Sequence, residues 1–408
     1  MHILYLHQHF VARSGTSGGR SHEFSKILVE KGHQVTLVTG AYDRSGLDLP
    51  SGRRIVRMDV DGIDVIAANV PYGQNMSMLR RMVSFAHFMV MSTWIACRVR
   101  NIDVVFATST PLTIAVPGLI ASLIRRKPFV FEVRDLWPAI PIEMGILKNP
   151  VIKLVAKLLE KVAYRRASHV VALSPGMKAG VVAVDGRPDV VSVVPNSSDV
   201  ELFRVPADVG DDFRTQHPEI GGRPLVVYAG AFGRVNGFDY VLRLVEHAAR
   251  LYPEICWVLC GQGSEKEWII ESATAKGLLG KNLLVLDPLP RRELARLLSA
   301  ADILTSFFLP LPLMETNSAN KFFDALAAGK PVALNYGGWQ ADILRETGAG
   351  LVLDANDPEK AAKQVADALA DRAWLASAAD ASRRLGDERF DRRKLALELE
   401  HVLLSVVK

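Results

Sequence analysis

Short apolar runs alternate with helix-like segments along nearly the whole chain. Near the amino end, residues 3–6 and 35–39 are apolar runs of strand length, and residues 20–31 between them have a helical pattern. A strand, a helix and a second strand in this order form a βαβ unit with parallel strands. Further strand-length runs lie at residues 63–67, 104–107, 129–133, 170–173 and 190–194. The alternation predicts a parallel sheet with helices on both faces.

A polar, proline-containing stretch at residues 195–224 interrupts this series. The series then resumes, with strands expected at 225–228, 256–260, 283–286, 303–306, 331–334 and 350–353, and helices at 240–251, 265–276, 291–300 and 322–328. A chain of 408 residues exceeds the size of about 250–300 at which single cores stop growing. We therefore expect an α/β protein with two Rossmann-like, doubly wound domains facing each other across a cleft. The first is residues 1–200, joined by a carboxyl-terminal helix at 386–408, and the second is residues 201–385. Ligands of such domains bind at the carboxyl ends of the strands.

Composition limits the expected cellular location and the kinds of ligand. The three cysteines, Cys97, Cys256 and Cys260, suggest no disulfide framework and favour a reduced, cytoplasmic location. Residues 1–6 resemble a buried strand, and no signal-peptide pattern is present. The ten histidines are scattered, so no metal site is expected, and no motif of a nucleic-acid-binding protein accompanies the net charge of +5.

Basic clusters at residues 80–81, 98–100 and 125–127 border the apolar segments 82–97 and 111–124. Cations beside apolar helices favour the anionic inner surface of a cytoplasmic membrane. Residues 82–97 fall short of the roughly 20 residues that a membrane-spanning helix needs. Ordinary solvated helix ends are the alternative interpretation.

The segment at residues 315–331 predicts a ligand-binding helix start. Asn317 or Ser318 can cap the helix, and the N–H groups of its first turn attract an anion such as a diphosphate. Lys321 adds positive charge, while Asp324 is placed to accept hydrogen bonds from a sugar hydroxyl. A capped amphipathic helix with a surface lysine is the alternative.

Three glycine-rich connections follow expected strands. The first contains Gly18 and Gly19, the second contains Gly233, Arg234 and Asn236, and the third begins at Gly261. None is a GxGxxG motif, and no acid ends the strand at 35–39, so a nicotinamide cofactor is disfavoured. Arg234 and Asn236 can donate to phosphate oxygens. A flexible turn remains the alternative for the first connection.

Two acids, an arginine and an indole lie at the end of the strand at residues 129–133. They are Glu132, Arg134, Asp135 and Trp137. Charges at the end of a buried strand are costly unless they are paired or used. A structural ion pair between Arg134 and Asp135 is the alternative to a functional role.

Together, residues 131–138, 194–199, 230–237 and 320–331 resemble the motifs of glycosyltransferase family 4, retaining enzymes with the two-domain GT-B fold. The likeness extends over nearly the whole chain and is strongest to enzymes of O-antigen, capsule and exopolysaccharide synthesis, including N-acetylfucosamine transferases. It implies a UDP-sugar donor, an undecaprenyl-diphosphate-linked saccharide acceptor, no cofactor and no metal. It also implies a peripheral location on the inner face of the cytoplasmic membrane, and no nucleic-acid partner.

The candidate site residues fall into three groups. The catalytic group is Gly19, Arg134, Asp135 and Lys321. The donor-binding group is Gly18, Gly19, Gly233, Arg234, Asn236, Gly261, Glu315, Asn320, Lys321 and Asp324. The acceptor-binding group is Glu132 and Trp137.

The chain departs from the family pattern at three places. Asp324 matches the second acid of the family's E-x7-E motif, but Thr316 occupies the first position, so Glu315 is the expected replacement. Ala231 and Asn236 stand where an arginine and a lysine usually bind the diphosphate, and Lys321 and Arg234 are expected to substitute. Arg134 stands at the position of a frequent active-site histidine. A UDP-sugar 2-epimerase of the same architecture and a non-catalytic sugar-nucleotide-binding protein remain alternatives.

Overall fold

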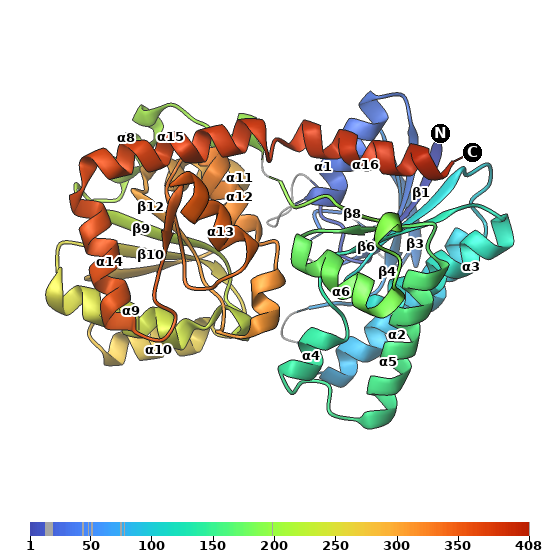
Figure 1. Cartoon of the computed structure of the whole chain (residues 1–408), viewed down its shortest axis with the longest axis horizontal. Coiled ribbons are helices and arrows are strands. Elements are labelled where there is room, and N and C mark those ends of the chain that lie inside the picture. The colour runs from blue at the N-terminus through green and yellow to red at the C-terminus, as the bar shows by residue number, and fades with distance from the viewer. Residues whose placement is uncertain are drawn as a thin grey trace. The chain divides into compact units, whose positions relative to one another are not determined.

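The computed structural model describes residues 1–12, 19–42, 45–47, 49, 52–73, 76, 78–197 and 199–407. The chain divides into two compact units, coloured along the chain in Figure 1. Unit 1 comprises Met1–Pro195 and Arg393–Lys408, and unit 2 comprises Asn196–Arg392. Each unit is built around its own largely parallel sheet, which confirms the predicted α/β class with two doubly wound domains.

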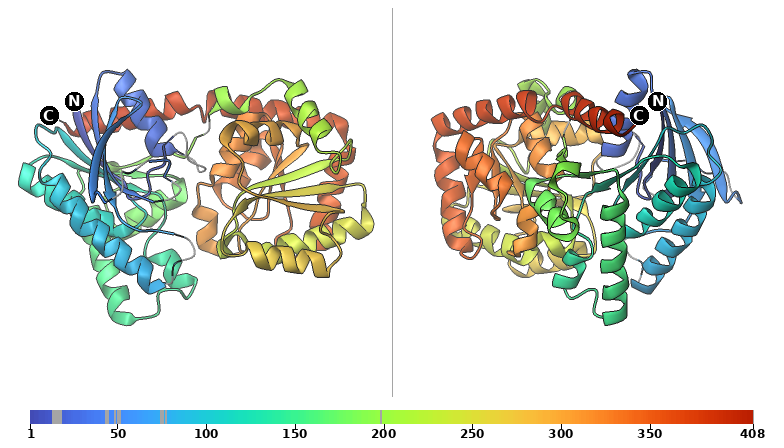
Figure 2. Two further views of the ribbon diagram at one scale, coloured as in Figure 1. Left: turned by 180° about the vertical axis from the view of Figure 1, so that it is seen from behind. Right: turned by 45° about the vertical axis from the view of Figure 1, so that its right-hand side comes forward.

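Unit 1 contains a sheet in the order β3-β4-β2-β1-β5-β6-β7-β8. Its strands are β1 (His2–Leu6), β2 (Gln34–Ala41), β3 (Ile55–Val60), β4 (Ile63–Asn69), β5 (Val104–Thr108), β6 (Phe129–Val133), β7 (His169–Ala172) and β8 (Val191–Val193). Its helices are α1 (Arg20–Glu30), α2 (Met78–Ala96), α3 (Ala115–Arg125), α4 (Ala139–Glu143), α5 (Pro150–Arg166), α6 (Pro175–Asp185) and α16 (Arg392–Val406), with 3-10 turns η1 (Leu112–Ile114) and η2 (Pro188–Val190). Both views in Figure 2 show helices on the two faces of this sheet.

Unit 2 contains a parallel sheet in the order β11-β10-β9-β12-β13-β14. Its strands are β9 (Leu225–Ala231), β10 (Cys256–Gln262), β11 (Leu283–Leu286), β12 (Ile303–Ser306), β13 (Val332–Leu334) and β14 (Gly350–Val352). Its helices are α7 (Val200–Phe203), α8 (Ala207–Gln216), α9 (Phe238–Leu251), α10 (Lys266–Ala275), α11 (Arg291–Ala300), α12 (Asn320–Ala328), α13 (Trp339–Thr347), α14 (Pro358–Ala370) and α15 (Arg372–Glu388), with 3-10 turns η3 (Arg234–Asn236) and η4 (Pro312–Thr316).

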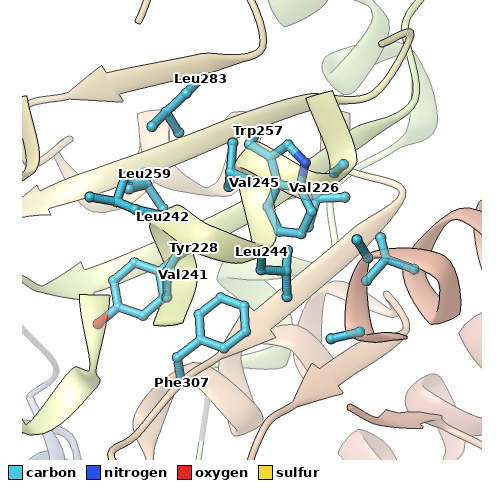
Figure 3. Close-up of a cluster of buried hydrophobic side chains, with 14 of the residues drawn as sticks. Val226, Tyr228, Val241, Leu242, Leu244, Val245, Trp257, Leu259, Leu283 and Phe307 are labelled. Atoms are coloured by element: carbon cyan, nitrogen blue, oxygen red, sulfur yellow. The ribbon is translucent and has the colours of Figure 1, made fainter. Parts of the chain in front are cut away.

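One apolar core of unit 2 lies between its sheet and α9. Val241, Leu244 and Val245 project from α9 toward Trp257 of β10 and Phe307, which follows β12 (Figure 3). All five are at most 1% exposed. Because α9 buries a whole face here, the loop between β9 and α9 is attached at both ends to rigid elements.

The sequence analysis missed strand β3 and gave no range for several helices, including α6, α7, α8, α13 and α14. β3 pairs with β4 in an antiparallel hairpin, so the sheet of unit 1 is not purely parallel. Asp61 and Gly62 form its two-residue turn, with φ of 54° and 82°. An Asp-Gly pair with both φ angles positive is the turn that matches the twist of a hairpin. The polar stretch at residues 195–224, which the sequence analysis treated as a break in the series, contains the short helices α7 and α8.

Candidate functional site

The sheet of unit 2 has a switch point between β9 and β12. From β9 the chain moves outward through β10 to β11, and from β12 it moves the other way through β13 to β14. Connections leave these two adjacent strands on opposite sides of the sheet, and ligands of open α/β sheets bind in the resulting crevice. The carboxyl ends of β9 and β12 are therefore where a ligand site of this unit is expected.

Lys321, in the first turn of α12, lies at this switch point. Its ammonium is 4.9 Å from the ring centre of Tyr228 on β9 and 5.0 Å from that of Phe308, which follows β12. Its Nζ donates to Oδ1 of Asn236 at 3.2 Å. Burial lowers the pKa of Lys321 to about 8, and the Asp324 carboxylate opposes this shift. The lysine is thus a desolvated cation held in place by two rings and an amide.

The loop between β9 and α9 supplies the amide. Asn236 is buried, and its Nδ2 donates to the carbonyl oxygens of Ala231 at 3.0 Å and Gly233 at 3.3 Å. Gly237 ends η3 with φ 61°, a conformation that favours glycine. Arg234 is exposed on this loop. Asn236 therefore orders the loop and orients Lys321. The sequence analysis expected Asn236 to bind phosphate, but these hydrogen bonds leave the asparagine side chain little capacity to do so.

The start of α12 differs from the prediction. Neither Asn317 nor Ser318 caps the helix, because α12 begins one residue later, with Ala319 at the N-cap and no side-chain cap. Ser318 instead binds Asn196: its Oγ accepts from the Asn196 backbone N–H at 3.2 Å, and its carbonyl oxygen accepts from Asn196 Nδ2 at 2.7 Å. Asn317 Nδ2 donates to the carbonyl oxygen of Met314. The N–H groups of the first turn, beginning at Asn320, thus have no side-chain cap, as an anion-binding helix start requires.

Gly261 has a structural explanation that the sequence analysis did not foresee. It pairs with Gly230 across β10 and β9, and a Cβ at position 261 would lie 1.8 Å from the Gly230 carbonyl oxygen. Gly263 is equally restricted, since its Cβ would lie 2.2 Å from the Phe232 carbonyl oxygen. Close backbone packing requires both glycines, so the predicted donor contact of Gly261 is not needed to explain it.

The two acids expected to bind the donor lie on different elements. Asp324 is on α12, one turn after Lys321. Glu315 is exposed on η4, and its carboxylate lies against the glycines that precede α13. A Cβ at Gly337 would come within 2.9 Å of Glu315 Oε1, and one at Gly338 within 2.3 Å of the Glu315 carbonyl oxygen. Thr316, at the position of the missing acid, donates through its hydroxyl to the Leu313 carbonyl oxygen at 2.7 Å.

The sheet of unit 1 has its own switch point, between β1 and β5. His7 directly follows β1, and its Nε2 lies 3.3 Å from Arg134 NH1, while its Nδ1 lies 2.8 Å from Ser21 Oγ. Because a guanidinium can only donate, Nε2 accepts and Nδ1 carries the proton. Burial, followed by the Arg134 charge, holds the pKa of His7 well below its ordinary value. His7 is therefore neutral and holds Arg134 at the end of β6.

Asp135 does not pair with Arg134 through a direct ion pair. Its carboxylate accepts from Thr110 Oγ1 at 2.8 Å. Burial raises the pKa of Asp135, against the lowering effects of Thr110 and Arg134. The backbone N–H of Trp137 donates to the Asp135 carbonyl oxygen at 2.9 Å, and the indole is partly exposed. The carboxyl end of β6 thus presents a cation, a desolvated carboxyl and an indole together.

Glu132 is not available to an acceptor, contrary to the sequence analysis. Its side chain is fully buried on β6. Oε2 accepts from Arg20 Nε at 3.0 Å and NH2 at 2.8 Å, and Oε1 accepts from Thr108 Oγ1 at 2.8 Å. Gly19, the N-cap of α1, directly precedes Arg20, whereas Gly18 lies outside the described residues. Glu132 therefore attaches the start of α1 to the sheet.

Several residues that shape these two faces were not singled out from the sequence. In unit 1 they are His7, Arg20, Ser21 and Thr110, and in unit 2 they are Tyr228, Phe308, Gly337 and Gly338. His7 had a usable signal, because it directly follows the first expected strand, where ligand-facing residues gather. The others depend on contacts between residues far apart in sequence.

The described residues contain neither a metal-binding cluster nor a membrane-spanning helix. Among them, no three histidine, cysteine, aspartate or glutamate side chains are grouped closely enough to bind a metal ion. Within the same part of the chain, every helix is too short or too polar to cross a bilayer.

Comparison with known proteins agrees with this architecture. Residues 15–197 match the family described as "Glycosyl transferase 4-like domain", and residues 210–385 match "Glycosyl transferases group 1". A D-inositol 3-phosphate glycosyltransferase of Xylanimonas cellulosilytica is 30% identical over 48% of this chain and 48% of its own length. A human subunit of phosphatidylinositol N-acetylglucosaminyltransferase is 23% identical over 72% of this chain and 55% of its own length. The matched region thus spans about half of each curated relative.

A solved structure extends the likeness to the whole chain. HepE of Anabaena, in complex with UDP and glucose, superimposes with a TM-score of 0.74 and 19% identity, covering 99% of this chain and 100% of that chain. At this identity the likeness establishes the fold. The chain thus carries, in order, the two domain types of family 4-type glycosyltransferases, folded in the GT-B architecture.

Proposed function

We propose that the protein transfers an N-acetylated hexosamine or deoxyhexosamine from a UDP-sugar to a lipid-linked saccharide, with retention of anomeric configuration, in bacterial surface polysaccharide synthesis. The acceptor carrier is undecaprenyl diphosphate, and the enzyme works at the inner face of the cytoplasmic membrane. The observation that carries the proposal is the desolvated Lys321 ammonium at the β9/β12 switch point, beside an uncapped helix start. A fixed cation and free N–H groups are what a diphosphate needs.

The names of two similar proteins support the substrate classes. HepE was solved with UDP and glucose, which supports a UDP-linked donor. The human relative is named for phosphatidylinositol and N-acetylglucosamine transfer, which supports an N-acetylated sugar and a lipid acceptor.

The proposed chemistry follows from the leaving group. As the bond between the anomeric carbon and the diphosphate oxygen breaks, negative charge develops on the phosphate. Lys321 and Arg234 stabilise that charge, together with the N–H groups at Asn320, so no metal is required. The acceptor hydroxyl attacks the anomeric carbon from the face that the diphosphate leaves, and its proton passes to the departing phosphate oxygen. The new bond then replaces the old one on the same face.

The remaining site residues position the two substrates. Asp324 accepts hydrogen bonds from the ribose hydroxyls, and Glu315 is the candidate for the second ribose contact. On unit 1, Arg134, Asp135 and Trp137 face the acceptor. The Gly18 and Gly19 connection contacts the donor phosphates and the acceptor.

A panel of nucleotide sugars read by thermal shift tests the donor class. A ligand at 100 times its dissociation constant stabilises the folded protein by about 2.7 kcal/mol. The best donor is then incubated with undecaprenyl-diphosphate-linked acceptors, with and without EDTA, while UDP release and product configuration are followed. An inverted product contradicts the retaining mechanism. Isomerised free sugar without an acceptor identifies a 2-epimerase, and stabilisation without turnover under any condition identifies a binding protein.

A further inference from the structure

Helix α5 of unit 1 exposes an apolar stripe. The exposed side chains are Val151 (66%), Leu154 (58%), Val155 (58%), Leu158 (54%) and Val162 (46%). Their spacing places them on one side of the helix, because residues three, four and seven apart share a helical face. Ala163 and Tyr164 are buried on another face of the same helix. The stripe is therefore an additional apolar surface, beyond what α5 needs for packing on unit 1.

The charges around this stripe are of one sign. Lys157, Lys161, Arg165 and Arg166 are exposed on α5, and Lys148 is exposed just before it. The helix contains one acid, Glu160, which is buried at 8% exposure. Burial raises the pKa of Glu160 to about 7, against the opposing effects of Tyr164 and Lys157. The solvent-facing side of α5 thus combines apolar and basic side chains, with no acid among them.

The helix has its own start signal. Pro150 occupies the first turn, and Asn149 Oδ1 accepts from the backbone N–H groups of Val151 at 2.9 Å and Ile152 at 3.2 Å. A proline in this position and an asparagine cap both favour a helix start. The stripe is therefore presented on a preformed helix attached to the sheet of unit 1.

We propose that α5 is a membrane-docking helix that lies in the plane of an anionic lipid bilayer. The apolar stripe enters the boundary between headgroups and acyl chains, and the flanking lysines and arginines contact lipid phosphates. From Val151 to Val162 the stripe runs for about 17 Å along the helix axis, a length suited to lying on a bilayer rather than crossing it. The absence of exposed acids on α5 favours an anionic bilayer over a protein surface of mixed charge.

This assignment differs from the segments that the sequence favoured. On α2, the exposed large apolar side chains among the described residues are Met82 (40%), Val83 (61%), Val90 (65%) and Trp94 (50%), and the exposed residues between Val83 and Val90 include His87. Arg98, beyond the end of α2, stacks on Trp94 with its guanidinium carbon 3.7 Å from the ring centre. On unit 1, α3 contacts both α2 and α5 (Figure 1), yet among the described side chains of these three helices, only those of α5 form a continuous stripe of five exposed large apolar residues.

Flotation of the full chain with vesicles tests the proposal. Vesicles of phosphatidylcholine with about one third phosphatidylglycerol are compared with pure phosphatidylcholine, at low and high salt. We expect wild-type protein to bind the anionic vesicles and to lose binding as salt rises. The double variant Leu154→Ser/Leu158→Ser should bind at least tenfold less. Lys157→Gln/Lys161→Gln should bind about 25-fold less, since each basic residue near an anionic surface contributes about fivefold.

A matched control shows whether vesicle binding depends on the α5 stripe in particular or on exposed apolar area in general. Val83→Ser/Val90→Ser on α2 removes equally exposed side chains and should bind as wild type does. All variants replace exposed residues, so circular dichroism and melting temperature should be unchanged. The proposal is overturned if wild type ignores anionic vesicles, if the α5 variants bind normally, or if the α2 variant loses as much as they do.

The proposal rests on the proposed function only for its biological purpose, which is access to a lipid-linked acceptor. Vesicle binding is measured without donor or acceptor, and UDP affinity is measured without lipid. Failure of the docking proposal therefore does not contradict the proposed function, and failure of the proposed function does not contradict docking. An α5 variant that fails to float but binds UDP normally separates docking from the glycosyltransferase site.

Discussion

Arg20 and Glu132 form a buried ion pair in which Oε2 of Glu132 accepts from both Nε and NH2 of the arginine. The same guanidinium donates to the carbonyl oxygens of Val194 at 3.0 Å and Pro195 at 2.5 Å, the last residues before the chain leaves unit 1. One side chain thus connects the start of α1, strand β6 and the end of β8, three segments that are far apart in sequence.

Glu132→Gln should destabilise the protein strongly, because it leaves the Arg20 charge buried without its counter-ion. Removing one partner of a buried pair costs about 3–5 kcal/mol. The double variant Arg20→Met/Glu132→Leu should lose clearly less than the sum of the losses of the single variants Arg20→Met and Glu132→Leu. Urea unfolding of all four proteins measures this coupling, and additive losses would show that the pair is not a unit.

Lys321→Ala should weaken UDP binding by about 1.5–3 kcal/mol, the range for hydrogen bonds to charged groups. Lys330 provides a control. It lies two residues beyond Ala328, the last residue of the same helix, and lines a pocket of about 380 Å³ with Ala328, Asp302 and Arg372. Lys330→Ala should leave UDP affinity unchanged. Calorimetry of both variants decides the matter, and normal UDP affinity in Lys321→Ala would exclude Lys321 from the donor site.

UDP affinity should depend on pH through Lys321. Its pKa is lowered to about 8 by burial, so the ammonium carries its charge below pH 8 and loses it above. A bound diphosphate favours the charged form and raises this pKa. Affinity should therefore be constant below pH 8 and fall by up to tenfold per pH unit above it. Lys321→Arg, whose guanidinium stays charged, should bind with no such decline, and a decline of equal size in both proteins would assign the titration to another group.

Gly19→Val should abolish sugar transfer while the protein remains folded. Among the described residues, the atoms nearest to a Cβ at position 19 would be His22 Cβ and the Val11 carbonyl oxygen, at 3.5 and 3.6 Å, which is ordinary contact. The φ of −102° is also accessible to valine. A melting temperature close to that of wild type, together with no UDP release, would show that the valine side chain clashes with a substrate rather than with the protein. Normal turnover would show that this connection is only a turn.

Gly261→Ala should behave in the opposite way. Its Cβ would overlap the Gly230 carbonyl oxygen at 1.8 Å, so β9 and β10 must separate. Overpacking of this kind costs about 1–3 kcal/mol or more. Gly233→Ala, with 3.6 Å to Asn236 Nδ2, is the matched control and should fold normally. Thermal unfolding of the two variants checks the comparison, and equal stability would mean that the strands adjust without cost.

The predicted strands and helices mostly occur because each depends on local pattern. The apolar runs at 104–107 and 303–306 are β5 and β12, and the helical pattern at 291–300 is α11. The β3–β4 hairpin was missed because the mixed polar sequence of β3 outweighed a clear Asp-Gly turn signal. The prediction that Asn317 or Ser318 caps the helix was wrong, because Ser318 is hydrogen-bonded to Asn196, which is distant in sequence.

Side-chain partners were harder to predict than elements. Glu132 and Asp135 are three residues apart and both acidic, yet one is paired with Arg20 and the other bonds Thr110. Nothing in the local sequence distinguishes them, since each partner comes from a segment more than 20 residues away. Asn236 likewise reads as a phosphate ligand until its bonds to the loop carbonyls are seen. The predicted catalytic, donor and acceptor roles remain predictions for the experiments above.

Helix α16 makes unit 1 dependent on residues that are synthesised only after the whole of unit 2. Its side chains Leu395, Leu399 and Leu403 are buried, and Glu400 Oε1 lies 2.6 Å from His33 Nε2, beyond the end of α1. At about 5–20 residues per second, a ribosome needs about 10–40 s to translate the residues beyond 195. During that time unit 1 exposes the apolar surface that α16 will cover. A nascent chain stalled or truncated before residue 393 should therefore be a chaperone client, even though all eight described strands of its amino-terminal sheet are already made.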